Sequence, residues 1–329
     1  MAEVGPIEEL DDATAGALLP DRPVRGHKST FGRLLVIAGS LDYAGSALLV
    51  CLAAGRAGAG LVALAVPESL QPLFAAKVVE ATTMGLPEDD IEEVEPNGAL
   101  ARILDHEHDA LVLGPGLRPG LTTVELIRGL LAVDEEGTPP AVVDAEALRS
   151  LAAVDEWWLA VRRSSVLTPH TGEFARLRAA SGIAAEADGD LLGDDDARAA
   201  AATDAARRWG QVVVLKGART VIAAPDGRLA RASFENPAMA AGGTGDVLSG
   251  TIGALLAQRV EPYAAARLGV FLHGTAGESI RDRLGDAGLL ASDLPFEIAL
   301  ARKRLTATRA RRTAERKLGF RVRSTGTSS

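Results

Sequence analysis

The sequence predicts an α/β protein with a central, mostly parallel β-sheet, antiparallel strands at one edge and helices on both faces. Short runs that are apolar throughout alternate with longer helix-compatible runs, which is typical of parallel strands covered on both faces. The last three strand-like runs lie too close together for helices between them. With 329 residues, 47% of them hydrophobic, the chain can bury one large core.

A first β-α-β unit is predicted from residue 33 to residue 66. Residues 33–38, RLLVIA, suit a buried strand, and a helix-compatible run follows at 45–54. Gly58-Ala59-Gly60 ends that helix, because glycine adopts the backbone conformation that closes a helix. Residues 61–66, LVALAV, form the second strand.

The same alternation continues through the middle of the chain. It predicts strands at 110–113, 141–143 and 166–167, with helices near 121–132, near 145–160 and from 171. The acidic residues 183–197 are expected to form a solvated surface loop before a helix that ends near Trp209 and Gly210. A calcium site is disfavoured there, because the ordered oxygen spacing of an EF-hand is missing.

Three strands close in sequence are predicted at one edge of the sheet. They cover residues 212–215, 221–224 and 229–232, and the turn Pro225-Asp226-Gly227 suits an antiparallel connection. The predicted sheet is therefore mixed. A further apolar helix is expected from Val247 to Gln258.

The chain is predicted to have three parts. Residues 1–31 contain three prolines and little periodicity, so they are expected to form an N-terminal arm. Residues 32–305 form the predicted domain. Residues 306–329 are strongly basic and are expected to be a helix that fades into a disordered, solvated tail, with binding of an anionic partner as the alternative.

The composition argues against several classes of protein. A formal net charge of -9 disfavours a nucleic-acid binder, which needs cationic surface to displace counterions from phosphates. No apolar run approaches the roughly 20 residues that cross a bilayer, and the acidic start is unlike a secretory signal, so no membrane partner and a cytoplasmic location are predicted. Cys51, the single cysteine, is expected to pack in the core.

The segment Gly242-Gly243-Thr244-Gly245-Asp246 carries the main functional signal. It leads into an apolar helix, so backbone N–H groups converge at the positive end of a helix dipole and predict a site for a phosphoryl group in transfer. Asp246, in the first turn, can accept the proton of a substrate hydroxyl. The alternative is a helix cap after a tight turn, but the run of small residues exceeds what a cap requires.

A second segment, Leu215-Lys216-Gly217-Ala218-Arg219-Thr220, lies between two predicted strands near the ligand-binding edge of the sheet. Lys216 and Arg219 can face nucleotide phosphates, with a charged hairpin loop as the alternative. Neither a P-loop nor a G-x-G-x-x-G fingerprint occurs in a usable place. A Rossmann dehydrogenase is therefore disfavoured.

Further candidate residues follow other predicted strands. In the segment TPHTGE, His170 can donate to a substrate and Glu173 can hold a water or a magnesium ion; a capping turn at the start of a helix is the alternative. Gly114-Pro115-Gly116-Leu117 permits close backbone approach, and Asp144 ends the next strand. His106-Glu107-His108 has no third ligand nearby, so an exposed turn is expected.

Taken together, these motifs resemble the ADP/ATP-dependent NAD(P)H-hydrate dehydratases, a branch of the ribokinase-like fold, over about residues 25–300. They stand in the family's order: Gly39-Ser40, Tyr43-Ala44-Gly45-Ser46, Leu113–Leu117, Val143-Asp144-Ala145, Leu167–Glu173, Lys216-Gly217-Ala218 and Asn236–Gly250. The combination is highly specific, although several of the single motifs are not.

The resemblance implies a repair reaction in which ADP phosphorylates the 6-hydroxyl of (S)-NADHX or (S)-NADPHX, and phosphate is then eliminated to restore NADH or NADPH. Asp246 would be the base, and Mg²⁺ is expected between the donor phosphates. The other implied site residues are Gly243 and Gly245 around the phosphoryl group, Ser46, Gly116 and His170 at the hydrate together with Asp246, and Lys216, Gly217, Ala218, Arg219, Thr220 and Gly245 at the nucleotide.

Three positions depart from the family pattern. Ser46 stands where alanine is more frequent, and Glu235 and Ala238 replace glycines. The first 30 residues are too short for an epimerase domain, so a separate NAD(P)HX epimerase is expected as a pathway partner. A homo-oligomer is also expected, with the tetramer as the form common among relatives.

Two other functions compete with the dehydratase. A ribokinase-like kinase of a thiazole or pyridine alcohol would share the glycine-rich segment but would retain a phosphorylated product. A non-enzymatic nucleotide-binding protein is expected to lose Asp246 or Lys216, and both are present.

Overall fold

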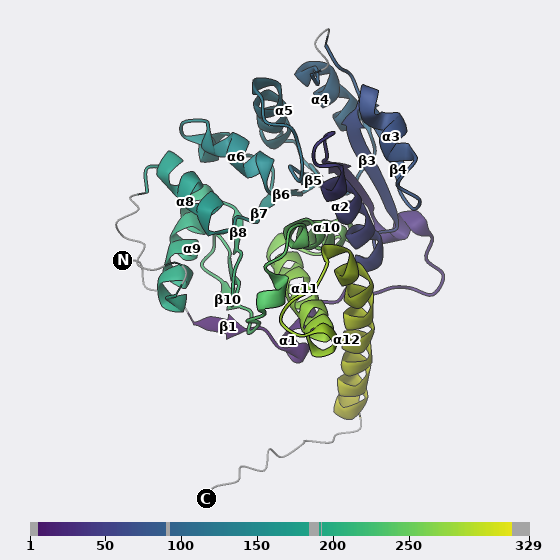
Figure 1. The fold of residues 1–329 in the computed structure, drawn as a ribbon. Coiled ribbons are helices and arrows are strands. Elements are labelled where there is room, and N and C mark those ends of the chain that lie inside the picture. Colours follow the sequence, from purple (N-terminus) through teal and green to yellow (C-terminus); the bar gives the residue numbers. More distant parts are fainter. Residues whose placement is uncertain (1–5, 90–92, 184–190, 192, 318–329) are drawn as a thin grey trace, which may run out of the picture.

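A computed structural model describes residues 6–89, 93–183, 191 and 193–317 (Figure 1). Its ten strands form one sheet in the order β1-β10-β9-β8-β7-β6-β5-β2-β3-β4. The strands are β1 Ile7–Glu9, β2 Arg33–Ile37, β3 Leu61–Pro67, β4 Thr82–Leu86, β5 Ala110–Leu113, β6 Ala141–Val143, β7 Ser165–Leu167, β8 Val212–Leu215, β9 Val221–Ala223 and β10 Leu229–Arg231.

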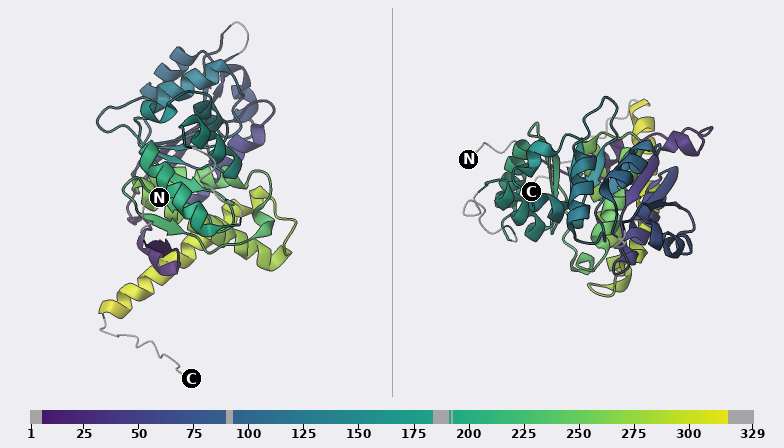
Figure 2. Two further views of the ribbon diagram at one scale, coloured as in Figure 1. Left: turned by 90° about the vertical axis from the view of Figure 1, so that its left-hand side faces the viewer. Right: turned by 90° about the horizontal axis from the view of Figure 1, so that it is seen from above.

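Helices cover both faces of the sheet (Figure 2). The α-helices are α1 Asp12–Ala17, α2 Ala44–Ala57, α3 Gln71–Ala75, α4 Pro96–Asp105, α5 Leu121–Leu131, α6 Glu146–Ala152, α7 Trp157–Ala160, α8 Thr171–Ala180, α9 Asp195–Trp209, α10 Thr244–Ala257, α11 Pro262–Leu284 and α12 Leu294–Lys317. Short 3-10 helices are η1 Lys28–Phe31, η2 Glu68–Leu70, η4 Pro237–Met239 and η5 Ala291–Asp293.

The period-two alternation of strand side chains divides the core into two layers. In β2, Leu34 and Val36 pack with α2, α10, α11 and α12, whereas Leu35 and Ile37 pack with α4, α5, α6, α8 and α9. All of these β2 side chains are buried, which explains why the strand reads as a continuous apolar run.

The predicted mixed α/β sheet is confirmed. Among the described strands only β9 runs against its neighbours, pairing antiparallel with both β8 and β10. The remaining pairs are parallel. The antiparallel strands therefore lie toward one edge, where the close sequence spacing predicts them.

Several elements differ from the sequence expectations. The single helix expected near 145–160 is two helices, α6 and α7, because the segment between them turns at Glu156, whose φ is 51°. β4 and α4 were not anticipated. Most of the expected acidic loop at 183–197 lies outside the described residues, and α9 already begins at Asp195.

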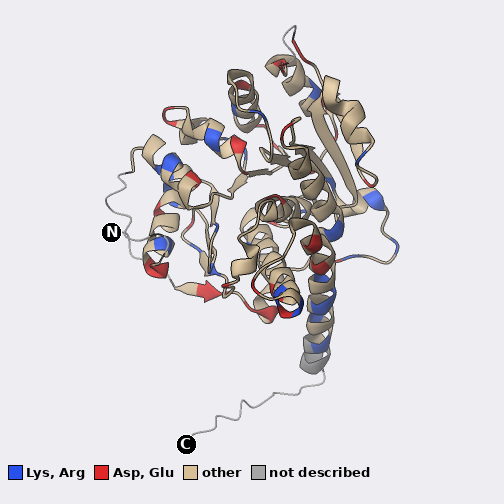
Figure 3. Ribbon diagram, in the orientation of Figure 1, with Lys and Arg blue, Asp and Glu red and all other residues tan. Residues whose placement is uncertain are grey.

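The segment expected to be an arm contributes to the sheet. β1 pairs parallel with β10, and Glu9 forms an ion pair with Arg231. At the other end of the chain α12 continues to Lys317, and Figure 3 shows Lys and Arg recurring along it. Part of the expected basic tail, 306–317, is therefore helical, while 318–329 lies outside the described residues.

Two further sequence expectations concern the core and the helices. Cys51 is buried in α2, and burial raises the pKa of its thiol to about 12, so it is an inert packing residue as expected. Among the described helices, none combines the length and the apolar character that crossing a bilayer would require.

Candidate active site

The candidate residues gather where parallel strands end. The segments that follow β2, β5, β6, β7 and β8 contain Ser46, Gly116, Asp144, His170 and Lys216, respectively. Because the carboxyl ends of parallel strands meet at one edge of a sheet, the topology brings these distant residues to a single place.

The N-terminus of α10 faces this place. Gly243 is its N-cap, with a left-handed φ of 89°, and a Cβ there would lie 2.6 Å from a methyl carbon of Leu49. No side chain caps the helix, and the amide groups of Gly245 and Asp246 have no hydrogen-bond partner among the described residues. Free donors at the positive end of a helix dipole are suited to an anion, so the structure leaves the predicted anion site open to a phosphoryl group.

Asp246 lies in the first turn of α10, where burial raises the pKa of its carboxyl to about 6. A hydrogen bond from Ser46 and the charge of Lys216 oppose this rise, while the nearby carboxylate of Asp144 adds to it. A carboxylate with a pKa close to neutrality is well matched to taking a proton from a hydroxyl.

Lys216 is held across from the anion site by two carboxylates. Its Nζ lies 2.7 Å from Oδ1 of Asp144 and 3.8 Å from Oε2 of Glu173. Burial lowers the pKa of the Lys216 ammonium, but the two carboxylates outweigh this and leave that pKa above its ordinary value. A Cβ on Gly245 would lie 3.4 Å from the same Nζ, so no side chain stands between the ammonium and the start of α10.

His170 and Glu173 form the capping box of α8. Nδ1 of His170 accepts the N–H of Gly172 at 3.0 Å, and the N–H of His170 donates to Glu173 Oε2 at 2.9 Å. The capping alternative is therefore observed, with His170 itself as the N-cap. It does not remove the residues from the site, since Glu173 also faces Lys216 and the His170 side chain is 56% exposed.

Ser46 and Gly116 lie together beside Asp246. A Cβ on Gly116 would stand 2.8 Å from Cβ of Ser46 and 2.7 Å from the carbonyl oxygen of Tyr43. Only glycine, here at a φ of 69°, fits this approach. The serine that departs from the family pattern thus bonds directly to the candidate base.

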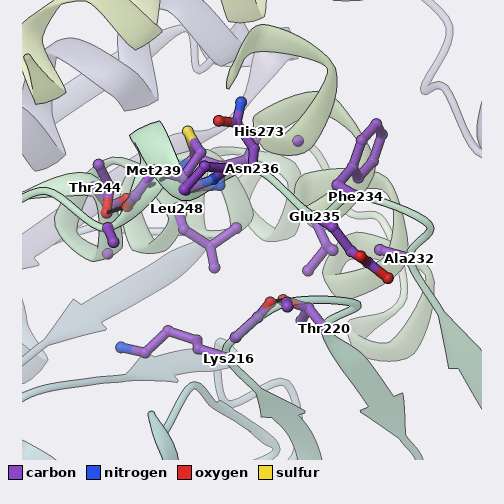
Figure 4. Close-up of a pocket in the computed structure, with 17 residues that line it drawn as sticks. Lys216, Thr220, Ala232, Phe234, Glu235, Asn236, Met239, Thr244, Leu248 and His273 are labelled. Carbon is purple, nitrogen blue, oxygen red and sulfur yellow. Dashed lines mark hydrogen bonds between the residues drawn. The ribbon is translucent and has the colours of Figure 1, made fainter. Parts of the chain in front are cut away.

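A cavity of about 580 Å³ opens beside Lys216 and the start of α10 (Figure 4). Its lining includes five of the residues assigned to the nucleotide: Lys216, Gly217, Ala218, Thr220 and Gly245. Cavities of this size are typical of small-molecule and cofactor sites.

Arg219 does not line that cavity. Its guanidinium lies 3.0 Å from Asp195, 3.3 Å from Glu9 and 4.0 Å from Glu235, which is itself part of the cavity lining. The backbone of Arg219 is left-handed, with a φ of 49°. A direct contact of Arg219 with the donor phosphates stays a prediction.

Three residues of the site had no assigned role in the sequence. Asp144, noted only as the end of a strand, binds Lys216 and accepts a 2.6 Å hydrogen bond from Ser249. Asn236 and His273 line the cavity. Asn236 belongs to a motif of the resemblance, but His273 stands within a long helix and carries no local signal.

The described residues contain no group of three or more His, Cys, Asp or Glu side chains arranged to hold a metal ion. His106 and His108, expected to form an exposed turn, are partly buried, and Nδ1 of His108 lies 2.6 Å from the carbonyl oxygen of His106. Neither histidine is part of the site.

Comparisons with known proteins agree with this arrangement. A family model described as NAD(P)H-hydrate dehydratase matches residues 34–299. The bifunctional NAD(P)H-hydrate repair enzyme Nnr of Moorella thermoacetica is 41% identical over 292 residues, which are 87% of this chain and 52% of that enzyme. The ADP-dependent (S)-NAD(P)H-hydrate dehydratase of Xanthomonas campestris is 34% identical over 273 residues, covering 83% of this chain and 89% of that protein.

Solved structures show the same relationship. The Bacillus subtilis ADP/ATP-dependent NAD(P)H-hydrate dehydratase, co-crystallised with ATP and Mg²⁺, superposes with a TM-score of 0.75 at 31% identity, covering 92% of this chain and 99% of that one. Ribokinase-like proteins of lower identity share the fold. The chain spans about half the length of the bifunctional relatives, 52% in the first two. It belongs to the NAD(P)H-hydrate dehydratase family, with the ribokinase-like fold that the sequence motifs indicate.

Proposed function

We propose that this chain is an ADP-dependent (S)-NAD(P)H-hydrate dehydratase. It transfers a phosphoryl group from ADP to the 6-hydroxyl of NADHX or NADPHX and then eliminates phosphate, which yields NADH or NADPH together with AMP. The observation that carries the proposal is the position of Asp246 in the first turn of α10, beside free amide groups and at the edge of a nucleotide-sized cavity. The names of the family relatives support the substrate.

The first step needs a base at the hydroxyl of the hydrate. Asp246 takes this proton as the hydroxyl oxygen bonds to the phosphorus of the donor. The hydrogen bond from Ser46 orients the carboxyl, and its raised pKa makes it a stronger base than an exposed aspartate. The product of this step is a phosphate ester, with AMP as the leaving group.

Groups that are already in position stabilise the negative charge of the phosphoryl group during its transfer. The amides of Gly245 and Asp246 and the dipole of α10 act from one side, and the ammonium of Lys216 acts from the other. Because Asp144 and Glu173 fix Lys216, the site does not have to reorganise as charge develops.

The hydrate itself is assigned to the opposite side of Asp246 from the cavity. Gly116 leaves room next to Ser46, and the exposed imidazole of His170 can donate a hydrogen bond to the substrate. This side carries the residues that the resemblance assigns to NADHX or NADPHX.

A magnesium ion is proposed to arrive with the donor phosphates, where it would neutralise their charge. Mg²⁺ in phosphoryl-transfer sites commonly uses only one or two protein carboxylates besides phosphate oxygens and water. Glu173 is proposed for this role, because its carboxylate is partly exposed and both the cap hydrogen bond and the contact with Lys216 use Oε2, so Oε1 carries no hydrogen bond among the described residues.

Several expectations stay predictions: a homo-oligomer, a separate NAD(P)HX epimerase, a cytoplasmic location, and a domain bounded at residues 32 and 305. The choice of ADP over ATP is also a proposal, supported by the name of the Xanthomonas relative.

Product analysis tests the proposed function. The purified chain is incubated with NADHX, Mg²⁺ and ADP, and AMP, inorganic phosphate and the dinucleotide are measured together. Equal amounts of AMP, phosphate and NADH are expected. A stable phosphorylated dinucleotide without phosphate release would contradict the dehydratase.

A further inference from the structure

A histidine on a distant helix forms part of the cavity wall. His273 of α11 lines the same cavity as Lys216 and Gly245 (Figure 4). Its Nε2 lies 2.9 Å from the carbonyl oxygen of Thr244, at the start of α10. A carbonyl oxygen can only accept a hydrogen bond, so Nε2 must carry the proton.

The second ring nitrogen of His273 is therefore an acceptor. Burial lowers the pKa of His273 to about 4, so the ring is neutral and Nδ1 has a free lone pair. Nδ1 has no hydrogen-bond partner among the described residues, and it is not one of the polar atoms that the protein seals from solvent. A ligand in the cavity can reach it.

Asn236 lines the same cavity, but its amide nitrogen is not open to a ligand. Its Oδ1 accepts the N–H of Ala238 at 3.0 Å, which fixes the amide orientation. Its Nδ2 is sealed from solvent and has no hydrogen-bond partner among the described residues. Of these two side chains, His273 is therefore the one that offers a polar atom to a ligand.

The rest of the lining suits a flat, weakly polar ring. It is formed largely by apolar side chains: Ala232, Phe234, Met239, Leu248 and Val270. A nucleobase in such surroundings is held by packing and identified by a few polar contacts. Here Nδ1 of His273 supplies such a contact, as a hydrogen-bond acceptor.

We propose that His273 reads the base of the nucleotide: its Nδ1 accepts a hydrogen bond from the exocyclic amino group of adenine. Hypoxanthine carries an oxygen in place of that amino group, so its lone pairs would face those of Nδ1. Adenine is thereby selected. The inference rests on the proposed use of the cavity by a nucleotide.

Binding of ADP and inosine diphosphate (IDP), each with Mg²⁺, tests this by calorimetry. The unaltered chain should bind ADP on the order of tenfold or more tightly than IDP, because IDP leaves a buried acceptor unpaired. His273→Phe should bring the ratio close to one, chiefly by weakening ADP. His273→Asn, which keeps an acceptor near Nδ1, should retain a preference for ADP, as should His27→Phe, a change of an exposed histidine outside the cavity.

An unchanged ADP:IDP ratio in His273→Phe would overturn the proposal. The proposal would also be overturned if His273→Phe kept the ADP:IDP ratio but lost the discrimination between ADP and 2′-deoxy-ADP. That result would assign Nδ1 to the ribose. If His273→Phe does not fold, the unaltered chain still tests the proposal with a third nucleotide, purine riboside diphosphate, which lacks the 6-substituent. Its affinity should lie between those of ADP and IDP. Equal affinities for all three nucleotides would refute base reading.

This test does not depend on turnover. Selective ADP binding that requires His273, in a protein that restores no NADH, would sink the proposed function and leave the base reading intact. NADH recovery at equal rates with ADP and IDP would instead support the proposed function and refute the base reading.

Discussion

The Nζ of Lys216 lies 2.7 Å from Oδ1 of Asp144, and the other oxygen of that carboxylate accepts a hydrogen bond from Ser249 in α10. The Asp144 side chain is only 2% exposed and that of Lys216 is 19% exposed. One carboxylate thus ties the ends of β6 and β8 to the helix that carries the candidate base.

Breaking this ion pair should cost stability. Lys216→Met leaves the Asp144 carboxylate buried without its cation, and the free energy of unfolding should fall by about 3–5 kcal/mol. The matched double variant Lys216→Met/Asp144→Asn should regain part of the loss, because no unpaired charge remains. Urea denaturation measures all three proteins, and a single variant as stable as the unaltered chain would argue against a tightly coupled pair.

Asp246→Asn should abolish most turnover while the chain still binds ADP. Removing a general base typically costs about 10²–10⁴-fold in rate, whereas the amides and Lys216 that receive phosphate remain. Steady-state kinetics and ADP calorimetry on the same preparation check this. Asp226→Asn, in an exposed turn, is the matched control; near-normal turnover in Asp246→Asn would remove the assigned base.

Activity should follow the ionisation of Asp246. Burial raises the pKa of this carboxyl to about 6, and only the ionised form accepts a proton, so kcat should rise with pH through about 6 and then level off. Rates measured from pH 5 to pH 8 locate this limb. A profile that is flat across pH 6 would mean that another group takes the proton.

The same pKa predicts a pH-dependent stability difference. The folded-state pKa of Asp246 is raised above its unfolded value, so its effect on stability is absent below about pH 4 and becomes a growing penalty as pH rises through about 6. Asp246→Asn should therefore be more stable than the unaltered chain at pH 8, by about 1–3 kcal/mol, and similar to it near pH 4. Denaturation at the two pH values checks the sign; a variant less stable at pH 8 would contradict it.

Much of the fold follows from local pattern. The boundaries expected for the strands at residues 110–113 and 141–143 agree with β5 and β6, because buried parallel strands are apolar throughout. The sequence did not predict β1, because this strand is not apolar throughout. It is Ile7-Glu8-Glu9 at the sheet edge, and its carboxylates are held by Arg267 and Arg231 from distant elements.

In the candidate site, too, some features follow from local sequence patterns and others depend on contacts between distant elements. The run of small residues before Asp246 is a local signal, and the structure places it at a free helix N-terminus as expected. The ion pairs of Arg219 with Glu9 and Asp195 join elements that are far apart in the sequence, so no local pattern reveals them. His273 lies 29 residues from the Thr244 carbonyl that fixes its tautomer, so only the packing of α11 against α10 shows its role.

The most direct test of the central claim is the return of reduced-nicotinamide absorbance when the purified chain meets NADHX, Mg²⁺ and ADP, compared with ATP and with Asp246→Asn. We predict recovery of NADH with ADP, accompanied by phosphate, and almost none in the variant. A folded protein that binds ADP yet restores no NADH with either nucleotide would contradict the account.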